Sequence, residues 1–134
     1  MKIVSRIFDR FVGFDVHAAT ISVAVAEVGG DARFIGTVPN QDQAVIKLVK
    51  RLNTAGPWTA CYEAGPTGYA LYWLLNKLGI TCSVIAPTLV PMKSGDRLKT
   101  DRRDALRLAQ SFRAGELTPI VSVKLSQGYV PGEQ

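Results

Sequence analysis

The sequence has few of the residues on which many catalytic and metal sites depend. It contains one histidine, His17, and two cysteines, Cys61 and Cys82, among 134 residues. This scarcity excludes a histidine-rich metal site and a zinc site built from paired CxxC motifs. The cysteines lie in separate apolar, strand-like runs, so we expect buried free thiols rather than a disulfide. The sequence also has no P-loop, no GxSxG nucleophile elbow and no zinc-ligand spacing.

Long hydrophobic runs are also missing. Every apolar stretch is far shorter than the ~20 residues that a membrane helix needs, so we expect no membrane partner. Residues 1–10 carry charges but no apolar segment followed by a cleavage site, so we expect no secretory signal. A composition of 47% hydrophobic and 20% charged residues is typical of one ordinary globular domain with a core of its own.

The hydrophobic pattern predicts an α/β fold. Residues 11–16, 20–28 and 32–38 read as strands, and Gly-Gly-Asp at 29–31 is a hairpin turn. Helical spacing follows Asn40 and recurs over residues 70–78 and 100–113, with Asn40 and Thr100 as the expected N-caps. Strands at 58–62 and 80–86 separate these helices. The order βββ-α-β-α-β-α predicts a mixed sheet with helices on both faces.

The C-terminal segment is less clear. The pattern of residues 119–125 fits either one more strand or a tail, and residues 126–134 have the composition of a turn. We therefore expect one domain over residues 11–118, followed by a tail or the start of a linker to a further domain over residues 119–134.

Four acids stand out as candidate catalytic and metal-binding residues. Asp15 and Glu63 each close a strand-like run, and Asp101 and Asp104 are spaced to share one helix face. Converging carboxylates repel one another unless cations lie between them, and hard oxygen ligands suit magnesium or manganese. Two such ions about 4 Å apart can activate a water or hydroxyl and stabilise the leaving oxygen in phosphodiester chemistry.

Each acid also has an ordinary structural interpretation. Asp15 can cap a turn, Glu63 can be a surface acid before a loop, and Asp101 and Asp104 can offset a helix dipole in a first turn. His17 is open between a local hydrogen-bonding role and a catalytic one.

Basic residues gather between positions 93 and 113. This stretch has seven basic and three acidic side chains and accounts for most of the net charge of +5. A concentrated basic patch is what binding to a phosphate backbone requires, and a solvated helix face with internal Arg–Asp pairs is the alternative. The residues predicted to bind nucleic acid are Lys93, Arg97, Lys99, Arg102, Arg103 and Arg107. The aromatic residues expected to pack in the core and on helices, rather than stack on bases, are Tyr62, Tyr69, Tyr72 and Trp73.

Three segments resemble the N-terminal part of the DEDD transposases, the group of insertion sequence 110 and its Piv-type invertase relatives. They are GFDVH at residues 13–17, YEAGPTGY at 62–69 and GDRLKTDRRDA at 95–105, in the same order and spacing. The resemblance runs from about residue 12 to residue 119, and its third motif is quite specific. The four acidic residues of the family fall on Asp15, Glu63, Asp101 and Asp104, which the resemblance assigns as catalytic residues and metal ligands.

The resemblance implies a RuvC-like member of the RNase H fold. It also implies Mg²⁺- or Mn²⁺-dependent DNA recombination and transposition, guided by a structured RNA made from the ends of the element. Family proteins are dimers or tetramers that act in the bacterial cytoplasm. They continue into a helical region and a second domain that supplies a catalytic serine. Because this chain ends at Gln134, before such a domain, we expect no complete recombination by this chain alone.

Two other hypotheses stay open at this point. The chain can be a non-catalytic nucleic-acid-binding or assembly module, in which neutralising the acids changes stability but not metal binding. It can also be a nucleotide-binding domain of the actin-like sugar-kinase superfamily. Those domains usually place a glycine just after the acid that ends their first strand, whereas residues 16–19 here are VHAA.

Overall fold

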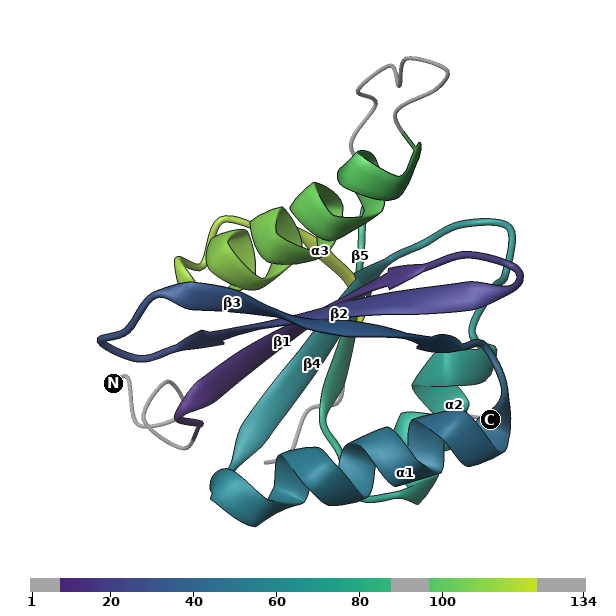
Figure 1. Cartoon of the computed structure of the whole chain (residues 1–134), viewed down its shortest axis with the longest axis horizontal. Coiled ribbons are helices and arrows are strands. Elements are labelled where there is room, and N and C mark those ends of the chain that lie inside the picture. The colour runs from purple at the N-terminus through teal and green to yellow at the C-terminus, as the bar shows by residue number, and fades with distance from the viewer. Residues whose placement is uncertain (1–7, 88–96, 123–134) are drawn as a thin grey trace.

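The computed structural model describes residues 8–87 and 97–122, which form a six-stranded mixed sheet with helices on both faces (Figure 1). The order across the sheet is β3-β2-β1-β4-β5-β6. β1, β2 and β3 pair antiparallel, β4 and β5 continue parallel to β1, and β6 pairs antiparallel with β5. The strands are β1 (Arg10–Val16), β2 (Thr20–Glu27), β3 (Ala32–Pro39), β4 (Trp58–Glu63), β5 (Cys82–Ile85) and β6 (Pro119–Ser122).

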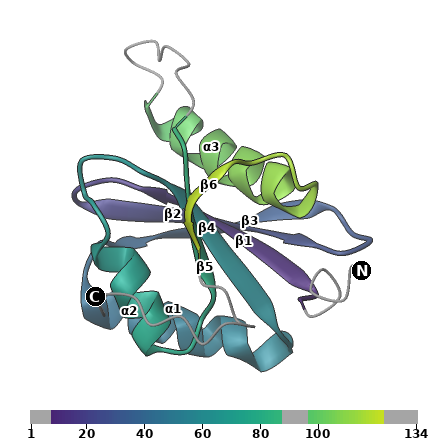
Figure 2. The ribbon, with the colours of Figure 1, turned by 180° about the vertical axis from the view of Figure 1, so that it is seen from behind.

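In the described part of the chain, three α-helices cover the two faces of the sheet. α1 (Asp42–Leu52), extended by the short 3-10 helix η2 (Asn53–Ala55), and α2 (Ala70–Lys77) lie on one face, and α3 (Arg97–Arg113) lies on the other. Figure 2 shows the same arrangement from behind. The predicted order of strands and helices is confirmed, and the fold is RNase H-like. β6 is the strand that the sequence left open, and it extends the sheet to Ser122.

Both predicted helix caps are wrong. α3 begins at Arg97, so Thr100 lies inside the helix. The N-cap position of α1 is held by Gln41, and the side chain of Asn40 instead donates a hydrogen bond of 2.8 Å to the carbonyl oxygen of His17. Asn40 therefore ties the end of β3 to the turn between β1 and β2.

The larger core lies between the sheet and the pair α1 and α2. Residues from alternate positions of β1, β2 and β4 meet the apolar stripes of both helices there, as the sequence predicts. Tyr62 and Tyr72 are buried in this core. Tyr69 and Trp73 make edge-to-face ring contacts with Tyr72 but stay 43% and 42% exposed. The predicted core packing is therefore confirmed for Tyr62 and Tyr72, whereas Tyr69 and Trp73 contact Tyr72 from the surface.

The opposite face of the sheet is lined with small residues, and this allows α3 to approach closely. Ala24 and Ala26 of β2 are buried against Ala105 and Ala109 of α3. A Cβ built on Gly13 of β1 would lie 2.7 Å from the backbone nitrogen of Ala109, a distance that real Cβ atoms do not adopt. Gly13 is therefore needed for α3 to lie directly on the centre of the sheet.

The cysteines are free and buried, as predicted. Burial raises the pKa of Cys82 to about 12 and that of Cys61 well above its usual range, so both thiols stay protonated. Across residues 8–87 and 97–122, no helix has the length and hydropathy to span a membrane.

Candidate functional site

Asp15 and Glu63 lie at the same end of the sheet and on the face that α3 covers. β1 and β4 run parallel, and their register pairs Phe14 with Tyr62, the residues directly before the two acids. Phe14 and Tyr62 point into the core beneath α1 and α2. Because successive side chains of a strand alternate between faces, Asp15 and Glu63 project toward α3.

The loop after Glu63 is fixed to β4. The hydroxyl of Tyr62 donates a 3.0 Å hydrogen bond to the carbonyl oxygen of Gly68 and accepts one from the backbone N–H of Tyr72. Gly68 has a φ of 71°, which favours glycine, and its N–H closes a turn onto the carbonyl of Gly65. The glycine-rich loop therefore leaves the sheet in a defined conformation beside the acids.

α3 brings Asp101 and Asp104 to this end of the sheet. Its far end is anchored by Arg113, which donates hydrogen bonds to the carbonyl oxygens of Glu27 and Gly30 in the hairpin between β2 and β3. Since α3 starts at Arg97, neither aspartate lies in its first turn. The interpretation that they offset the dipole of a first turn is therefore wrong.

His17 lies between two of the acids. Its Nε2 is 3.0 Å from Oδ2 of Asp15, in hydrogen-bonding geometry, and 3.0 Å from Oδ1 of Asp101. Asn40 and Thr20 hold its backbone, the first by the bond described above and the second by accepting its N–H at 2.8 Å. The local hydrogen-bonding role expected for His17 is confirmed, and the ring also contacts α3.

One carboxylate oxygen in this group has no hydrogen-bond donor among the residues that the structure describes. Oδ1 of Asp101 is buried and accepts no hydrogen bond, although Nε2 of His17 lies 3.0 Å away. Both observations hold because one ring nitrogen carries at most one proton, and that nitrogen has hydrogen-bonding geometry toward Asp15 only. A buried acceptor without a donor is costly, and a cation at this position would satisfy it.

The three side chains meet the geometric requirement for a shared metal ion. One ligand atom each from Asp15, His17 and Asp101 lies within 4.8 Å of the other two. Two carboxylates and an imidazole are ligands that divalent metals accept. The residues present therefore fit the divalent metal that the resemblance implies.

The electrostatics of Asp15 reflect this crowding. Burial raises its pKa from 3.8 to about 6. The hydrogen bond and charge of His17 act in the opposite direction, and the charges of Asp104 and Asp101 raise the pKa further. Without a cation, the folded protein therefore resists the charged form of Asp15.

Glu63 and Asp104 lie on the other side of the group. Arg107 of α3 donates a 3.4 Å hydrogen bond to Oε2 of Glu63, and the two form an ion pair. Burial raises the pKa of Asp104, Arg107 lowers it, and the charges of Glu63 and Asp101 raise it. The four predicted acids are thus electrostatically coupled at one end of the sheet, but only Asp15 and Asp101 share the close group with His17.

The predicted nucleic-acid-binding residues have different surroundings. Lys93 lies outside the described residues, and the structure describes Arg97 and Lys99 only through the backbone of α3. Arg102 lies over the ring of Phe34, 4.8 Å from its centroid, and Arg103 is exposed. Arg107, by contrast, points to Glu63, so part of the basic patch neutralises the acidic group.

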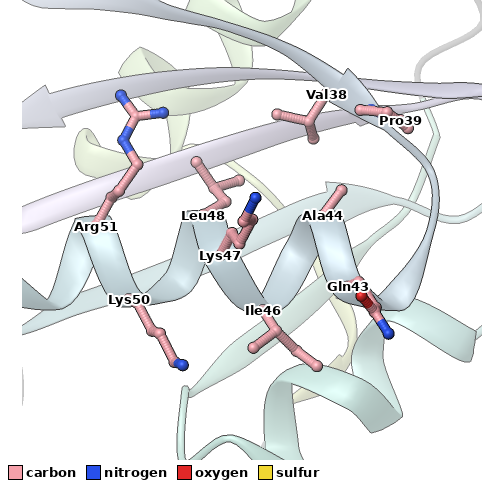
Figure 3. Close-up of a pocket in the computed structure, with 9 residues that line it drawn as sticks. All are labelled: Val38, Pro39, Gln43, Ala44, Ile46, Lys47, Leu48, Lys50 and Arg51. Atoms are coloured by element: carbon pink, nitrogen blue, oxygen red, sulfur yellow. The ribbon is translucent and has the colours of Figure 1, made fainter.

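A groove on the opposite face of the sheet holds none of the four acids. It runs between the end of β3 and the outer side of α1 and is lined by Val38, Pro39, Gln43, Ala44, Ile46, Lys47, Leu48, Lys50 and Arg51 (Figure 3). Three of these residues are cations. The groove is separated from the acids by the sheet, so it is not part of the candidate site.

Sequence reasoning left the role of His17 open and assigned Arg107 to nucleic-acid binding, so it placed neither side chain among the acids. His17 lies directly after β1, and its spacing of two residues from Asp15 is the signal that could have placed it beside that acid. The pairing of Arg107 with Glu63 had no signal in the sequence, because it depends on how α3 lies across the sheet.

Comparisons with known proteins agree with the resemblance. Residues 12–126 match the family model for DEDD transposases of insertion sequence 110, described as "Transposase". The chain is 47% identical over 115 residues to a putative transposase, y4qE, of Sinorhizobium fredii, covering 84% of this chain and 30% of that protein. It is 36% identical over 108 residues to the transposase for insertion sequence element IS1533 of Leptospira borgpetersenii, covering 78% and 31%. The chain thus spans less than a third of the length of these curated relatives.

Proposed function

The chain belongs to the insertion-sequence-110 family of DEDD transposases, and from this membership we propose that the acidic end of its sheet binds divalent cations for phosphodiester chemistry on DNA. The observation that carries the proposal is the convergence of Asp15, Asp101 and His17, where one buried carboxylate oxygen has no donor within residues 8–87 and 97–122. Asp15, Glu63, Asp101 and Asp104 are the proposed catalytic residues and metal ligands.

Bound Mg²⁺ or Mn²⁺ would polarise the phosphodiester and lower the pKa of a bound water or hydroxyl. The residues of the chain position this chemistry. Asp15 and Asp101 present oxygens from a strand and from a helix, so the spacing between them depends on the packing of α3 on β1. Arg107 holds Glu63 at the edge of the group and offsets part of its negative charge.

We propose that the exposed basic residues of α3 contact the DNA backbone beside this site. Their place on the helix that carries Asp101 and Asp104 supports this, since backbone contacts there would bring a phosphodiester to the acids. A structured guide RNA, a dimeric or tetrameric assembly and a cytoplasmic location are further proposals, which come from the resemblance. We also propose that the domain runs from β1 through β6, slightly beyond the predicted residues 11–118 at both ends, because β6 pairs with β5 in the same sheet.

A second candidate function has one specific observation in its favour. Two of the acids are paired with cationic or hydrogen-bonding side chains of the chain itself, Asp15 with His17 and Glu63 with Arg107. In that case the acids serve the structure, and the chain is a non-catalytic binding or assembly module within the transposase.

Titration of Mn²⁺ into metal-free protein separates the two candidates. We expect the wild type to bind Mn²⁺, and Asp104→Asn to weaken binding at least about tenfold, because a ligand or its immediate neighbour is lost. Asp42→Asn, the same substitution at an exposed acid in the first turn of α1, is the matched control and should bind as the wild type does. Equal binding by Asp104→Asn and Asp42→Asn would refute the proposed site.

A further inference from the structure

The distances around His17 match those between ligands of one metal ion. Nε2 lies 3.0 Å from Oδ2 of Asp15 and 3.0 Å from Oδ1 of Asp101. Adjacent ligands of an octahedral ion with bonds of about 2.0–2.1 Å are separated by about 2.8–3.0 Å. Nε2 therefore lies at the distance expected between adjacent ligands of one ion from each carboxylate oxygen. In the metal-bound form the ring proton would be carried by Nδ1, so that Nε2 offers its lone pair to the ion instead of donating a hydrogen bond to Asp15.

Hydrogen bonds to the backbone N–H and to the carbonyl of His17 fix the position of its ring. The turn after β1 is closed by the bond from the N–H of His17 to the carbonyl of Thr20, and Asn40 binds the carbonyl of His17. The ring leaves this turn toward α3 and is half-buried, with 28% of its side chain exposed. A side chain held in this way is already placed for binding and needs little ordering when an ion arrives.

We propose that Nε2 of His17 is a direct metal ligand, and that it gives the acidic site a preference for Mn²⁺ and similar transition-metal ions over Mg²⁺. The inference rests on the proposed function and adds a nitrogen to a site otherwise composed of carboxylates. Imidazole nitrogen suits transition metals, whereas Mg²⁺ favours oxygen ligands and gives up its waters reluctantly. A set of nitrogen and oxygen ligands therefore discriminates between Mn²⁺ and Mg²⁺ better than four carboxylates alone.

The single histidine makes this inference directly measurable. In tag-free protein loaded with Mn²⁺, pulsed electron paramagnetic resonance detects a nitrogen nucleus bonded to the ion, and His17 is the only imidazole in the chain. We expect ¹⁴N coupling in the wild type and its loss in His17→Gln, which keeps all four acids. Competition between the ions should show the Mn²⁺ preference over Mg²⁺ falling at least about tenfold in His17→Gln.

The outcomes separate this inference from the proposed function. If Mn²⁺ binds the wild type without ¹⁴N coupling, His17 is not a ligand and the carboxylate site stands. If Mn²⁺ does not bind the wild type at all, the proposed function fails and the inference fails with it.

A second variant covers the case in which His17→Gln does not fold. Asn40→Asp keeps a side chain of the same size but removes the N–H donor that binds the carbonyl of His17. We expect Mn²⁺ to bind this variant with weakened ¹⁴N coupling, because the ring is less firmly placed. Coupling in Asn40→Asp as strong as in the wild type would contradict the role given to the turn.

Discussion

At the scale of single residues, the site is defined by a conflict between burial and charge. The carboxyl group of Asp15 would be charged in water, but in the fold its side chain is only 15% exposed and lies near Asp101. Among the described residues, His17 is its one close hydrogen-bond donor. Burial is the largest cause of its raised pKa. A metal ion would remove this conflict, because it favours the charged form.

The raised pKa of Asp15 predicts how the stability of the metal-free protein depends on pH. Its folded pKa of about 6 lies above the ordinary 3.8. The stabilising contribution is therefore complete below pH 3.8 and is lost as the pH rises through 6. From pH 4 to pH 7 this residue should lower the free energy of unfolding by on the order of 2 kcal/mol.

Asp15→Asn is the matching variant, because its side chain is neutral at every pH. With a chelator present, chemical denaturation should show that the free energy of unfolding of the variant, relative to that of the wild type, rises by this amount between pH 4 and pH 7. Parallel pH profiles for the two proteins would show that Asp15 is not in the environment described.

At the scale of elements, the position of α3 decides whether a site exists. Two of the acids come from this helix and two from the strands beneath it, and Gly13 sets the distance between helix and sheet. The sequence predicts the features that follow from local patterns. These are the alternation of strands and helices, the turns, and the C-terminal ends of β1 and β4. The pairing of His17 with Asp101 and of Arg107 with Glu63 does not follow, because each depends on the angle at which α3 crosses the sheet.

The helix boundaries show the same limit. A cap is chosen by competition between several nearby residues, and Asn40 and Thr100 were both favourable by residue type. Asn40 binds the turn at His17 instead, which lies far away in the sequence. α3 gains an extra N-terminal turn, and this shifts Asp101 and Asp104 from the helix terminus to its interior.

Gly13→Ala tests the role of the contact between α3 and the sheet. The added Cβ would be 2.7 Å from backbone nitrogen of Ala109 and 2.9 Å from the carbonyl oxygen of Ala105, so backbone has to move. We expect a loss of about 1–3 kcal/mol in the free energy of unfolding, together with weaker Mn²⁺ binding.

Gly30→Ala is the control for this substitution. Its added Cβ would make only ordinary contacts of 3.7 Å with the side chain of Glu27, far from the acids. Chemical denaturation should show a much smaller loss in the free energy of unfolding than for Gly13→Ala. Mn²⁺ binding should be unchanged. Equal effects of the two substitutions would mean that Gly13 does not set the position of α3.

At the scale of the whole molecule, the two faces of the sheet carry different charge patterns. The α3 face combines the acids with basic residues on the same helix, whereas the α1 face carries Lys47, Lys50 and Arg51 along the groove without any of the four acids. If the net charge of +5 alone drew DNA to the protein, both faces would contribute equally. The proposed function requires the α3 face to dominate.

Charge reversal on each face tests this requirement. Arg103→Glu and Lys50→Glu change the net charge equally, and both residues are exposed. Arg103→Glu should weaken duplex DNA binding several-fold and lower the salt dependence by about one counterion, because a phosphate contact is lost. Lys50→Glu should have a clearly smaller effect in the same salt titration. Equal losses would indicate binding by net charge, with no preference for the acidic end.

The most direct test of the central claim is the thermal midpoint of the metal-free chain, with and without millimolar Mn²⁺, for the wild type and Asp15→Ala. An ion that binds only the folded state must raise the midpoint. The account predicts a rise in the wild type that is absent in Asp15→Ala, because the variant loses one of the two carboxylates that converge on His17. A wild type without a Mn²⁺-dependent rise, or a variant with the same rise, would contradict a metal site at this end of the sheet.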